Sequence, residues 1–264
     1  MTPDISRFSF VAIQAALRAG EELKRGFQTS YSITTKPGKH NLVTHYDTLA
    51  EEVILSIIHK EFPDHGVLAE ESGEDLKSST VTWIVDPLDG TVNFAHNIPV
   101  FSVSIAAVLQ NEVVCGVIYQ PITKELFVGE KNKGSFLNGK PLKVSSVSNL
   151  DDSFLATGFP YNLNENPLGC IEHLLSVLRK GLPVRRLGSA ALDLSYLAAG
   201  RYDGYWEVSL QPWDMAAGKL IVEEAGGKIT DYHGKDLNVK QPSSVVATNG
   251  LLHDSILSIL KVKK

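Results

Sequence analysis

The sequence predicts a mixed α and β protein made of two different parts. In the first part, two amphipathic helical patterns precede β-rich runs joined by short turns, as in a helix pair packed on a largely antiparallel sheet. In the second part, strands and helices alternate. The polar, serine-rich stretch 145–152 separates them. We therefore expect one domain of 264 residues with subdomains at about 1–144 and 153–264.

The N-terminal segment accounts for both helices of the first part. From about Asp4 to Phe27, apolar residues recur at helical spacing, and Gly26 is a suitable stop. The stretch 31–41 has the composition of a hairpin or a mobile loop. A second amphipathic helix begins near Asp47, and the pattern alone favours a role for this acid in complementing the helix dipole. The inner face of that helix carries Val53, Ile54, Ile57, Ile58 and Phe62.

The stretch WIVDPLDGTVNF, residues 83–94, carries the strongest indication of function. Its first residues are apolar and β-branched, so they predict a buried strand, which Pro87 is expected to end because proline has no N–H. Asp86 and Asp89 then lie three residues apart. A turn can bring both carboxylates and a backbone carbonyl to one point, which suits a hard cation. The alternative is an ordinary turn in which Asp89 caps the next segment.

Neighbouring segments strengthen the first interpretation. Gly90-Thr91 follows at once, where backbone N–H groups can bind a phosphate. The short apolar run 67–69 ends at Glu70, and a strand ending there can lie beside one ending in Asp86. Two adjacent glutamates are by themselves more typical of a solvated turn. Asp214 begins an apolar helix, either as a helix-start acid or as a partly buried carboxylate that needs a cation.

The remaining elements follow from the same patterns. Runs 101–109 and 113–119 predict an antiparallel hairpin, and runs 126–128 and 135–137 continue the meander. The second part is expected to contain strands 154–157, 184–187, 205–208, 228–230 and 245–248, and helices 171–178, 190–199, 215–225 and one from His253.

Four separated motifs resemble the inositol monophosphatase family, a group of Mg-dependent, lithium-sensitive phosphatases. In chain order they are Val43-Thr44-x-x-Asp47, Glu70-Glu71-Ser72, Asp86-Pro87-Leu88-Asp89-Gly90-Thr91, and Trp213-Asp214 leading into Glu224-Ala225-Gly226-Gly227. The resemblance covers essentially the full chain. It implies a layered αβαβα sandwich and a homodimer.

The resemblance also implies a role for each site residue. The metal ligands, for two or three Mg²⁺ ions, would be Glu70, Asp86, the Leu88 carbonyl, Asp89 and Asp214. Asp47 and Thr91 would orient the attacking water, with Glu70 beside them in the catalytic centre. The substrate contacts would be Asp89, Gly90, Thr91, Gly188, Ser189, Ala190, Glu207 and Asp214. This chain departs from the commonest family pattern at Ala69, Leu88 and Ser189, and these changes leave the metal site intact.

These features predict an enzyme, a phosphomonoesterase that hydrolyses myo-inositol monophosphate or a similar small polyol phosphate. A metal-activated water would attack the ester. Arg185-Arg186, just before Gly188, leaves open fructose 1,6-bisphosphate or histidinol phosphate, because these arginines could meet a second phosphate. We prefer the interpretation in which one arginine lies on the surface and the other pairs with an acid.

Composition limits the kinds of partner that the protein is expected to bind. The net charge is −5 and the sequence has no basic stripe, so nucleic acid is not an expected partner. A nonenzymatic role as the regulatory partner of a transcription or RNA-processing machine remains the alternative from another class. No signal-peptide pattern or membrane-spanning apolar run is evident, so we expect a cytoplasmic protein that does not bind membranes. Cys115 and Cys170 are expected to be buried thiols.

Overall fold

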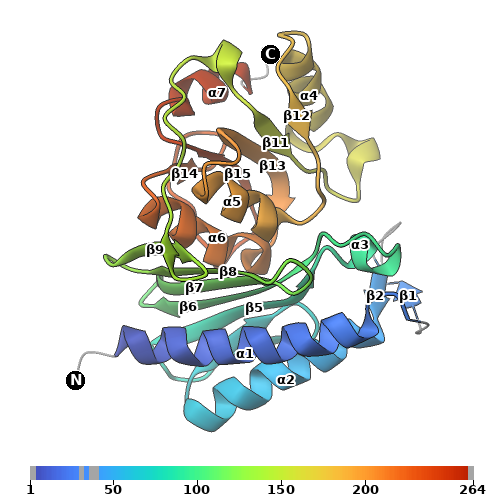
Figure 1. Cartoon of the computed structure of the whole chain (residues 1–264), viewed down its shortest axis with the longest axis vertical. Helices are drawn as coiled ribbons and strands as arrows, with labels where there is room; N and C mark the ends of the chain where they lie inside the picture. The colour runs from blue at the N-terminus through green and yellow to red at the C-terminus, as the bar shows by residue number, and fades with distance from the viewer. Residues whose placement is uncertain (1–3, 30–32, 36–41, 261–264) are drawn as a thin grey trace.

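The protein is a layered α/β sandwich, seen edge-on in Figure 1. The structure is a computed structural model that describes residues 4–29, 33–35 and 42–260. From one side to the other the layers are α1 with α2, an eight-stranded sheet, α5 with α6, a five-stranded sheet, and α4 with α7. The predicted αβαβα architecture is thus confirmed. No helix in the described ranges is long and apolar enough to span a membrane.

The outer helix pair is formed by α1 (Ile5–Gly26) and α2 (His45–Glu61), as the periodicity predicts. Asp4 caps α1, since its side chain accepts a hydrogen bond from the Ser6 N–H at 3.1 Å. Small buried residues let α1 approach its neighbours closely. Those side chains are Ala12, Ala15, Ala16 and Ala19. Ahead of α2, β1 (Ile33–Thr35) and β2 (Leu42–Thr44) pair antiparallel, in agreement with the hairpin alternative for 31–41. Residues 31, 32 and 36–41 of that stretch lie outside the described residues.

The first sheet is antiparallel except where β3 and β5 run side by side in parallel. Its strand order is β10-β9-β8-β7-β6-β5-β3-β4. The strands are β3 (Gly66–Ala69), β4 (Gly73–Asp75), β5 (Val81–Asp89), β6 (Ser102–Leu109), β7 (Glu112–Gln120), β8 (Glu125–Glu130), β9 (Gly134–Leu137) and β10 (Lys140–Pro141). The predicted hairpin and meander are confirmed, and the short helix α3 (Thr91–Ala95) follows β5.

The prediction that β5 ends at Pro87 is wrong. Its ladder with β6 pairs Asp86 with Ser104 and resumes by pairing Asp89 with Ser102. Three steps along β5 therefore oppose two along β6, which leaves one extra residue in a bulge. A proline is tolerated at such a bulge because no ladder hydrogen bond requires its N–H there. The bulge keeps both aspartates within the strand and turns the chain between them.

The second sheet has the order β12-β11-β13-β15-β14, parallel on the β12-β11-β13 side and antiparallel beyond it. Its strands are β11 (Leu155–Thr157), β12 (Val184–Arg185), β13 (Gly204–Leu210), β14 (Lys228–Thr230) and β15 (Ser243–Thr248). The helices of this part are α4 (Cys170–Leu178), α5 (Ala190–Ala198), α6 (Pro212–Glu224) and α7 (His253–Ile259). The predicted alternation of strands and helices is confirmed. Short 3₁₀ turns occupy Leu150–Asp152, Leu163–Glu165 and Pro167–Gly169.

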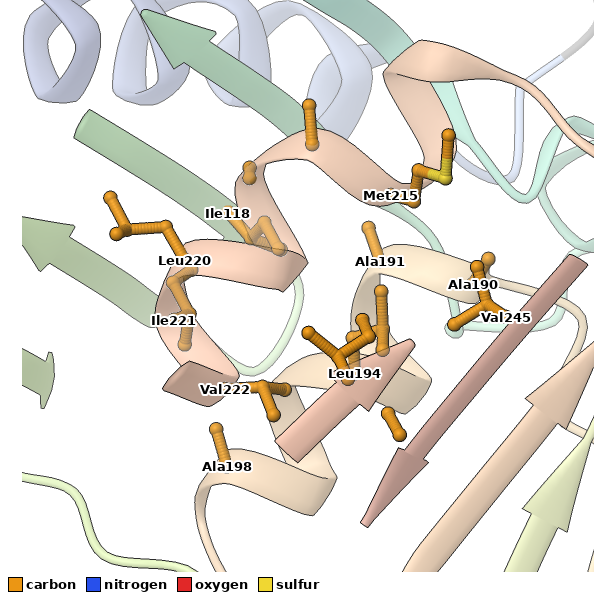
Figure 2. Close-up of a cluster of buried hydrophobic side chains, with 14 of the residues drawn as sticks. Ile118, Ala190, Ala191, Leu194, Ala198, Met215, Leu220, Ile221, Val222 and Val245 are labelled. Carbon is orange, nitrogen blue, oxygen red and sulfur yellow. The ribbon is translucent and has the colours of Figure 1, made fainter. Parts of the chain in front are cut away.

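Helices α5 and α6 fill the space between the two sheets (Figure 2). Their buried side chains form one cluster with Ile118 of the first sheet and Val245 of the second. The absence of a side chain at Gly116 of β7 lets α6 approach the first sheet closely. A Cβ atom there would lie only 2.7 Å from the carbonyl oxygen of Ala217. Because the two halves share this cluster, we propose that they unfold as one domain.

The stability of the protein should depend on pH through His253, which begins α7. The imidazole is buried between Thr230 Oγ1, 2.9 Å from Nε2, and Thr248 Oγ1, 3.1 Å from Nδ1. Burial lowers the His253 pKa from about 6.5 to about 4. Below pH 6.5 His253 becomes protonated in the unfolded chain, whereas in the folded protein it stays neutral until the pH approaches 4. The free energy of unfolding should therefore fall by about 1–3 kcal/mol between pH 7 and pH 4. In denaturant titrations, His253→Gln should reduce this loss, and an unchanged pH profile would contradict the prediction.

Candidate active site

Two parallel strand ends bring the first carboxylates together. In the β3–β5 ladder, Ala69 pairs with Val85, and the Glu70 N–H donates to the Val85 carbonyl at 3.1 Å. Glu70 and Asp86 therefore lie on adjacent strand ends, and the Glu70 side chain is close enough to Asp86 to hydrogen-bond with it. Asp89 lies farther along β5, and Asp214 occupies the first turn of α6. We call these four residues, Glu70, Asp86, Asp89 and Asp214, the acidic cluster.

Burial and mutual repulsion shift the pKa values of this acidic cluster. Burial, followed by the charges of Glu70, Asp89 and Asp214, raises the pKa of Asp86 well above its usual range. Burial and then Asp89 do the same to the pKa of Asp214. The Asp89 pKa rises only to about 6, since hydrogen bonds to its charged form oppose the burial effect. In the described part of the chain, no lysine, arginine or histidine forms an ion pair with Asp86, Asp89 or Asp214. A bound cation would relieve this excess of buried negative charge.

The donor chemistry of the acidic cluster fits a hard cation such as Mg²⁺. The available ligands are carboxylates and the Leu88 carbonyl, which are all oxygen donors. Within residues 4–29, 33–35 and 42–260, no group of three or more His, Cys, Asp or Glu side chains is arranged so that it could hold a metal ion. Two carboxylates of the cluster accept hydrogen bonds from protein donors: Asp86 Oδ1 from the Leu88 N–H at 2.9 Å, and Asp89 Oδ2 from Ser189 Oγ at 2.6 Å.

Asp47 links the start of α2 to the turn after β5. Its Oδ2 accepts hydrogen bonds from the Thr44 N–H at 2.7 Å and the Thr44 hydroxyl at 2.6 Å, so it has the helix-start role favoured by its position. Its Oδ1 is 2.9 Å from the Thr91 hydroxyl, which also lies 3.0 Å from the Leu88 carbonyl oxygen. Burial raises the Asp47 pKa to about 6. Asp47 therefore serves both as a helix cap and as the acceptor that orients Thr91.

Gly90 and Asn93 connect this turn to the other half of the molecule. Gly90 has φ = +96°, and a Cβ atom there would lie 2.9 Å from the Val100 carbonyl oxygen and 3.3 Å from that of Gly188. Asn93 Nδ2 lies 2.8 Å from the Val100 carbonyl oxygen and 2.8 Å from that of Leu187. The sequence analysis assigned no role to Asn93, although this residue lies within the stretch 83–94 that carries Asp86 and Asp89. Its partner at Leu187 is 94 residues away, so no local pattern could have identified the contact.

The loop before α5 contacts the acidic cluster directly. The Ser189 hydroxyl and the Ala191 N–H, at 2.8 Å, both donate to Asp89 Oδ2, and the Ala190 N–H also contributes. Gly188 has φ = +82°, a left-handed conformation that favours glycine. The predicted substrate residues 188–190 are therefore adjacent to Asp89 of the acidic cluster.

Glu207 lies on β13, on the other side of the same region. Its Oε2 accepts a hydrogen bond from the Tyr205 hydroxyl at 2.5 Å. Burial raises the Glu207 pKa to about 7. The charge of Asp89 adds a smaller increase, and the charge of Arg186 causes a smaller decrease. Because the charge of Asp89 contributes to this shift, Glu207 lies in the neighbourhood of the acidic cluster.

Two further buried acids were missed by our reading of the sequence. Glu51 Oε2 and Oε1 accept from the Glu71 and Ser72 N–H groups at 2.9 and 2.8 Å, so they hold the turn that carries Glu70. Asp193 is 1% exposed, and its Oδ1 has no hydrogen-bond partner among the described residues. Both acids occupy the apolar register of a helix, and a charged residue in such a register was the available signal.

The expectation for the two arginines needs correction. Within the described ranges, neither Arg185 nor Arg186 forms an ion pair. The Arg185 guanidinium instead lies 4.9 Å from the centre of the Phe154 ring, and that of Arg186 lies 5.7 Å from the centre of the Phe159 ring. Both side chains are exposed, and the stacking on aromatic rings satisfies them without an acid.

Comparisons with known proteins agree with this arrangement. Residues 4–263 match the model of the inositol monophosphatase family. The Inositol-1-monophosphatase of Caulobacter vibrioides is 43% identical over 94% of this chain and 99% of its own length. Nus factor SuhB of Escherichia coli is 38% identical over 95% of this chain and 94% of its own length.

Solved structures show the same similarity. The extragenic suppressor protein suhB from Bartonella henselae has a TM-score of 0.90 and 42% identity, covering 96% of this chain and 98% of that one. The inositol monophosphatase from Anabaena has a TM-score of 0.84 and 39% identity, covering 98% and 96%. The family match over nearly the whole length, the shared fold and the site to which each of the four motifs contributes a carboxylate lead to one conclusion: this chain belongs to the inositol monophosphatase family.

Proposed function

We propose that the protein is a Mg²⁺-dependent phosphomonoesterase that hydrolyses myo-inositol monophosphate or a similar small polyol phosphate. The main support is the buried group Asp86, Asp89 and Asp214, whose charges have no described basic partner and whose donors are all oxygen. When bound by Glu70, Asp86, the Leu88 carbonyl, Asp89 and Asp214, two or three Mg²⁺ ions would neutralise the phosphate and make a water more acidic.

Asp47 and Thr91 have the geometry to orient the attacking water. Because the Thr91 hydroxyl can donate its proton to Asp47 Oδ1 at 2.9 Å, its oxygen lone pairs are left to accept a hydrogen bond from a water. Glu70, at the neighbouring strand end, supplies a second acceptor on that side. These acceptors would hold the water with one lone pair directed at the phosphorus atom.

The opposite side would hold the polyol. The Tyr205 hydroxyl donates to Glu207 Oε2, and the other oxygen of this carboxylate could accept a hydrogen bond from a ring hydroxyl. The Ser189 hydroxyl and the Ala191 N–H lie beside Asp89, where the ester oxygen would lie. The fixed Gly90 and Asn93 contacts hold the phosphate side and the polyol side at a constant separation.

The test is phosphate release from inositol 1-phosphate with and without Mg²⁺. Activity should require Mg²⁺ and disappear in excess chelator, and activity that persists there would disprove the proposal. A comparison of kcat/KM on inositol 1-phosphate, fructose 1,6-bisphosphate and histidinol phosphate tests the substrate. The exposed pair Arg185-Arg186 keeps the bisphosphate as the alternative, and a preference for it would overturn our choice. Inhibition by lithium is expected from the family resemblance.

A nonenzymatic binding role is the second candidate, motivated by relatives named Nus factor SuhB. The net charge of −5 opposes direct nucleic-acid binding, and a protein partner would be required. Every acidic position of the proposed metal site is filled in this chain, which favours the enzyme. Tight binding to a transcription complex together with inactivity on all phosphate esters would reverse this preference.

We also propose a homodimer formed through α4. Leu168, Ile171, Leu175 and Leu178 are between 38% and 57% exposed, and the last three share one face of this helix. In a two-fold antiparallel pairing centred between Leu175 and Ser176, Glu172 of one copy would face Arg179 of the other. This charge complementarity favours a second copy of the chain over an unrelated partner.

Leu175→Glu should convert the dimer to a monomer, because it places a charge at the centre of the proposed apolar contact. Size-exclusion chromatography with light scattering measures the change. Phe10→Glu is the control, since Phe10 is 67% exposed on α1 and should leave the dimer unchanged. A monomeric wild-type protein would contradict the proposal.

A further inference from the structure

Glu70 lies in a short turn at the edge of the first sheet. Ala69 of β3 pairs with Gly73 of β4, so residues 70–72 form a three-residue turn between these two strands. The edge strand β4 has only three residues and is largely exposed. A short exposed ladder fixes a turn weakly, because few buried contacts surround it. The Glu70 carboxylate therefore needs support from outside the sheet if it is to keep one position.

Glu51 of α2 supplies this support. Its two carboxylate oxygens accept hydrogen bonds from the Glu71 N–H at 2.9 Å and the Ser72 N–H at 2.8 Å. On the other side, the N–H of Glu70 itself donates to the Val85 carbonyl at 3.1 Å. The backbone is thus held both at Glu70 and immediately after it. Glu51 is only 4% exposed, so water competes little for its oxygens, and hydrogen bonds to a charged acceptor are the stronger kind.

The same helix carries Asp47, one turn before Glu51. Residues four apart lie on one face of a helix, so both side chains leave α2 on the same side. Asp47 Oδ1 is 2.9 Å from the Thr91 hydroxyl in the turn after β5, whereas Glu51 holds the turn after β3. One helix therefore connects both strand ends, and it sets the position of the Glu70 backbone relative to Thr91.

Building on the proposed function, we propose that Glu51 is a positioning residue that holds the Glu70 carboxylate in place to bind Mg²⁺. The Glu51 oxygens already accept two backbone N–H groups, so this side chain acts through the turn. Residues that orient a metal ligand typically change metal affinity or activity by about 10-fold to 100-fold when they are replaced. The alternative is a contact that stabilises the fold and has no effect on the metal.

Glu51→Gln tests this role, because glutamine keeps the length and one acceptor oxygen but places an NH₂ group opposite a backbone N–H. In calorimetry, Mg²⁺ should bind about 10-fold to 100-fold more weakly. The Mg²⁺ concentration that gives half-maximal activity should rise by a similar factor. Glu51→Asp, which keeps the charge but shortens the side chain by one methylene, should also weaken Mg²⁺ binding and provides the measurement if Glu51→Gln does not fold.

A double-mutant cycle shows whether Glu51 acts through Glu70. When Glu70→Gln is already present, Glu51→Gln should cause little further loss of Mg²⁺ affinity, because the ligand that it positions has been altered. Asp203→Asn is the matched control. Asp203 is also a buried carboxylate that accepts a backbone N–H, from Phe154 at 2.6 Å, but it precedes β13 at the opposite end of that strand from Glu207. This variant should lower the melting temperature and leave Mg²⁺ affinity unchanged.

Three results on the variants would overturn the inference. Unchanged Mg²⁺ affinity in Glu51→Gln with a lower melting temperature would leave Glu51 only a structural role. An equal loss of Mg²⁺ affinity in Asp203→Asn would show that any destabilisation weakens the metal. A full additional loss in the Glu70→Gln background would show that Glu51 does not act through Glu70.

Failure of the proposed function gives a different pattern. A wild-type protein that binds Mg²⁺ but hydrolyses no ester would disprove the function, and the calorimetric comparison would still decide the role of Glu51. A wild-type protein that binds no Mg²⁺ would overturn both. If the wild type binds Mg²⁺ and hydrolyses the ester, unchanged Mg²⁺ affinity in Glu51→Gln would overturn the inference alone.

Discussion

Asp86→Asn is expected to lower kcat by at least about 100-fold to 1000-fold, the range seen when one group that stabilises a transition state is removed. Asp86 lies between Glu70 on the neighbouring strand and Asp89 beyond the bulge of its own strand. We propose that it is the carboxylate that two Mg²⁺ ions would share. Asparagine keeps the size of the side chain and an oxygen that can accept from the Leu88 N–H, but it loses the charge. Mg²⁺ affinity, measured by calorimetry, should fall together with kcat.

The same substitution should leave the metal-free protein as stable as the wild type or more stable. Because the folded-state pKa of Asp86 is raised, its ionised form opposes folding at neutral pH, and protonation at low pH relieves this cost. The uncharged amide of the variant would mimic the protonated carboxyl at every pH. The stability difference between the two proteins should therefore be greatest near pH 7 and should shrink as the pH falls toward 4.

A control separates this site effect from ordinary turn chemistry. Asp231 is also an acid that accepts backbone N–H groups, those of His233 and Lys235 at 2.8 Å, but it follows β14 at the far edge of the second sheet. Asp231→Asn should cost a little stability and leave kcat and Mg²⁺ affinity unchanged. If Asp86→Asn behaved in that way, turning over at a near wild-type rate, the turn interpretation would be correct and the shared-ligand role would be wrong.

Local patterns predicted those parts of the fold and site that depend on neighbouring residues. The apolar runs before Glu70 and Asp86 indicated strands, and the rule that ligands lie beyond strand ends placed the two acids side by side. Periodicity likewise indicated α1, α2 and the alternation of the second half. Pro87 misled the prediction, because whether a proline ends a strand depends on the register of the partner strand β6.

The parts that could not be predicted depend on contacts between distant segments. Glu51 binds N–H groups about twenty residues away, and Asn93 binds a carbonyl in the other half of the chain. Tertiary packing decides each of these contacts, so sequence spacing alone carries no information about them.

Gly90→Ala is expected to destabilise the protein by about 3 kcal/mol and to lower kcat/KM by at least about 10-fold. Two physical effects add. A non-glycine residue in the left-handed region costs about 1–2 kcal/mol, and Gly90 has φ = +96°. The new Cβ would also lie 2.9 Å from the Val100 carbonyl oxygen, and this neighbour is backbone that cannot rotate away. Relief of that contact must move residues 90 and 91 relative to the Gly188 loop, and this would displace the proposed phosphate contacts from the proposed polyol contacts.

Gly139→Ala measures the first effect alone. Gly139 has φ = +78°, but a Cβ atom there would meet nothing within 4 Å, and the residue lies in the turn between β9 and β10, away from the site. This variant should lose only about 1 kcal/mol in denaturant titrations and keep full activity. The difference between the two variants is then the cost of the clash at Gly90. Equal losses of stability, or normal kcat/KM in Gly90→Ala, would show that the turn can shift freely and that its fixed contact with the Gly188 loop is not required for catalysis.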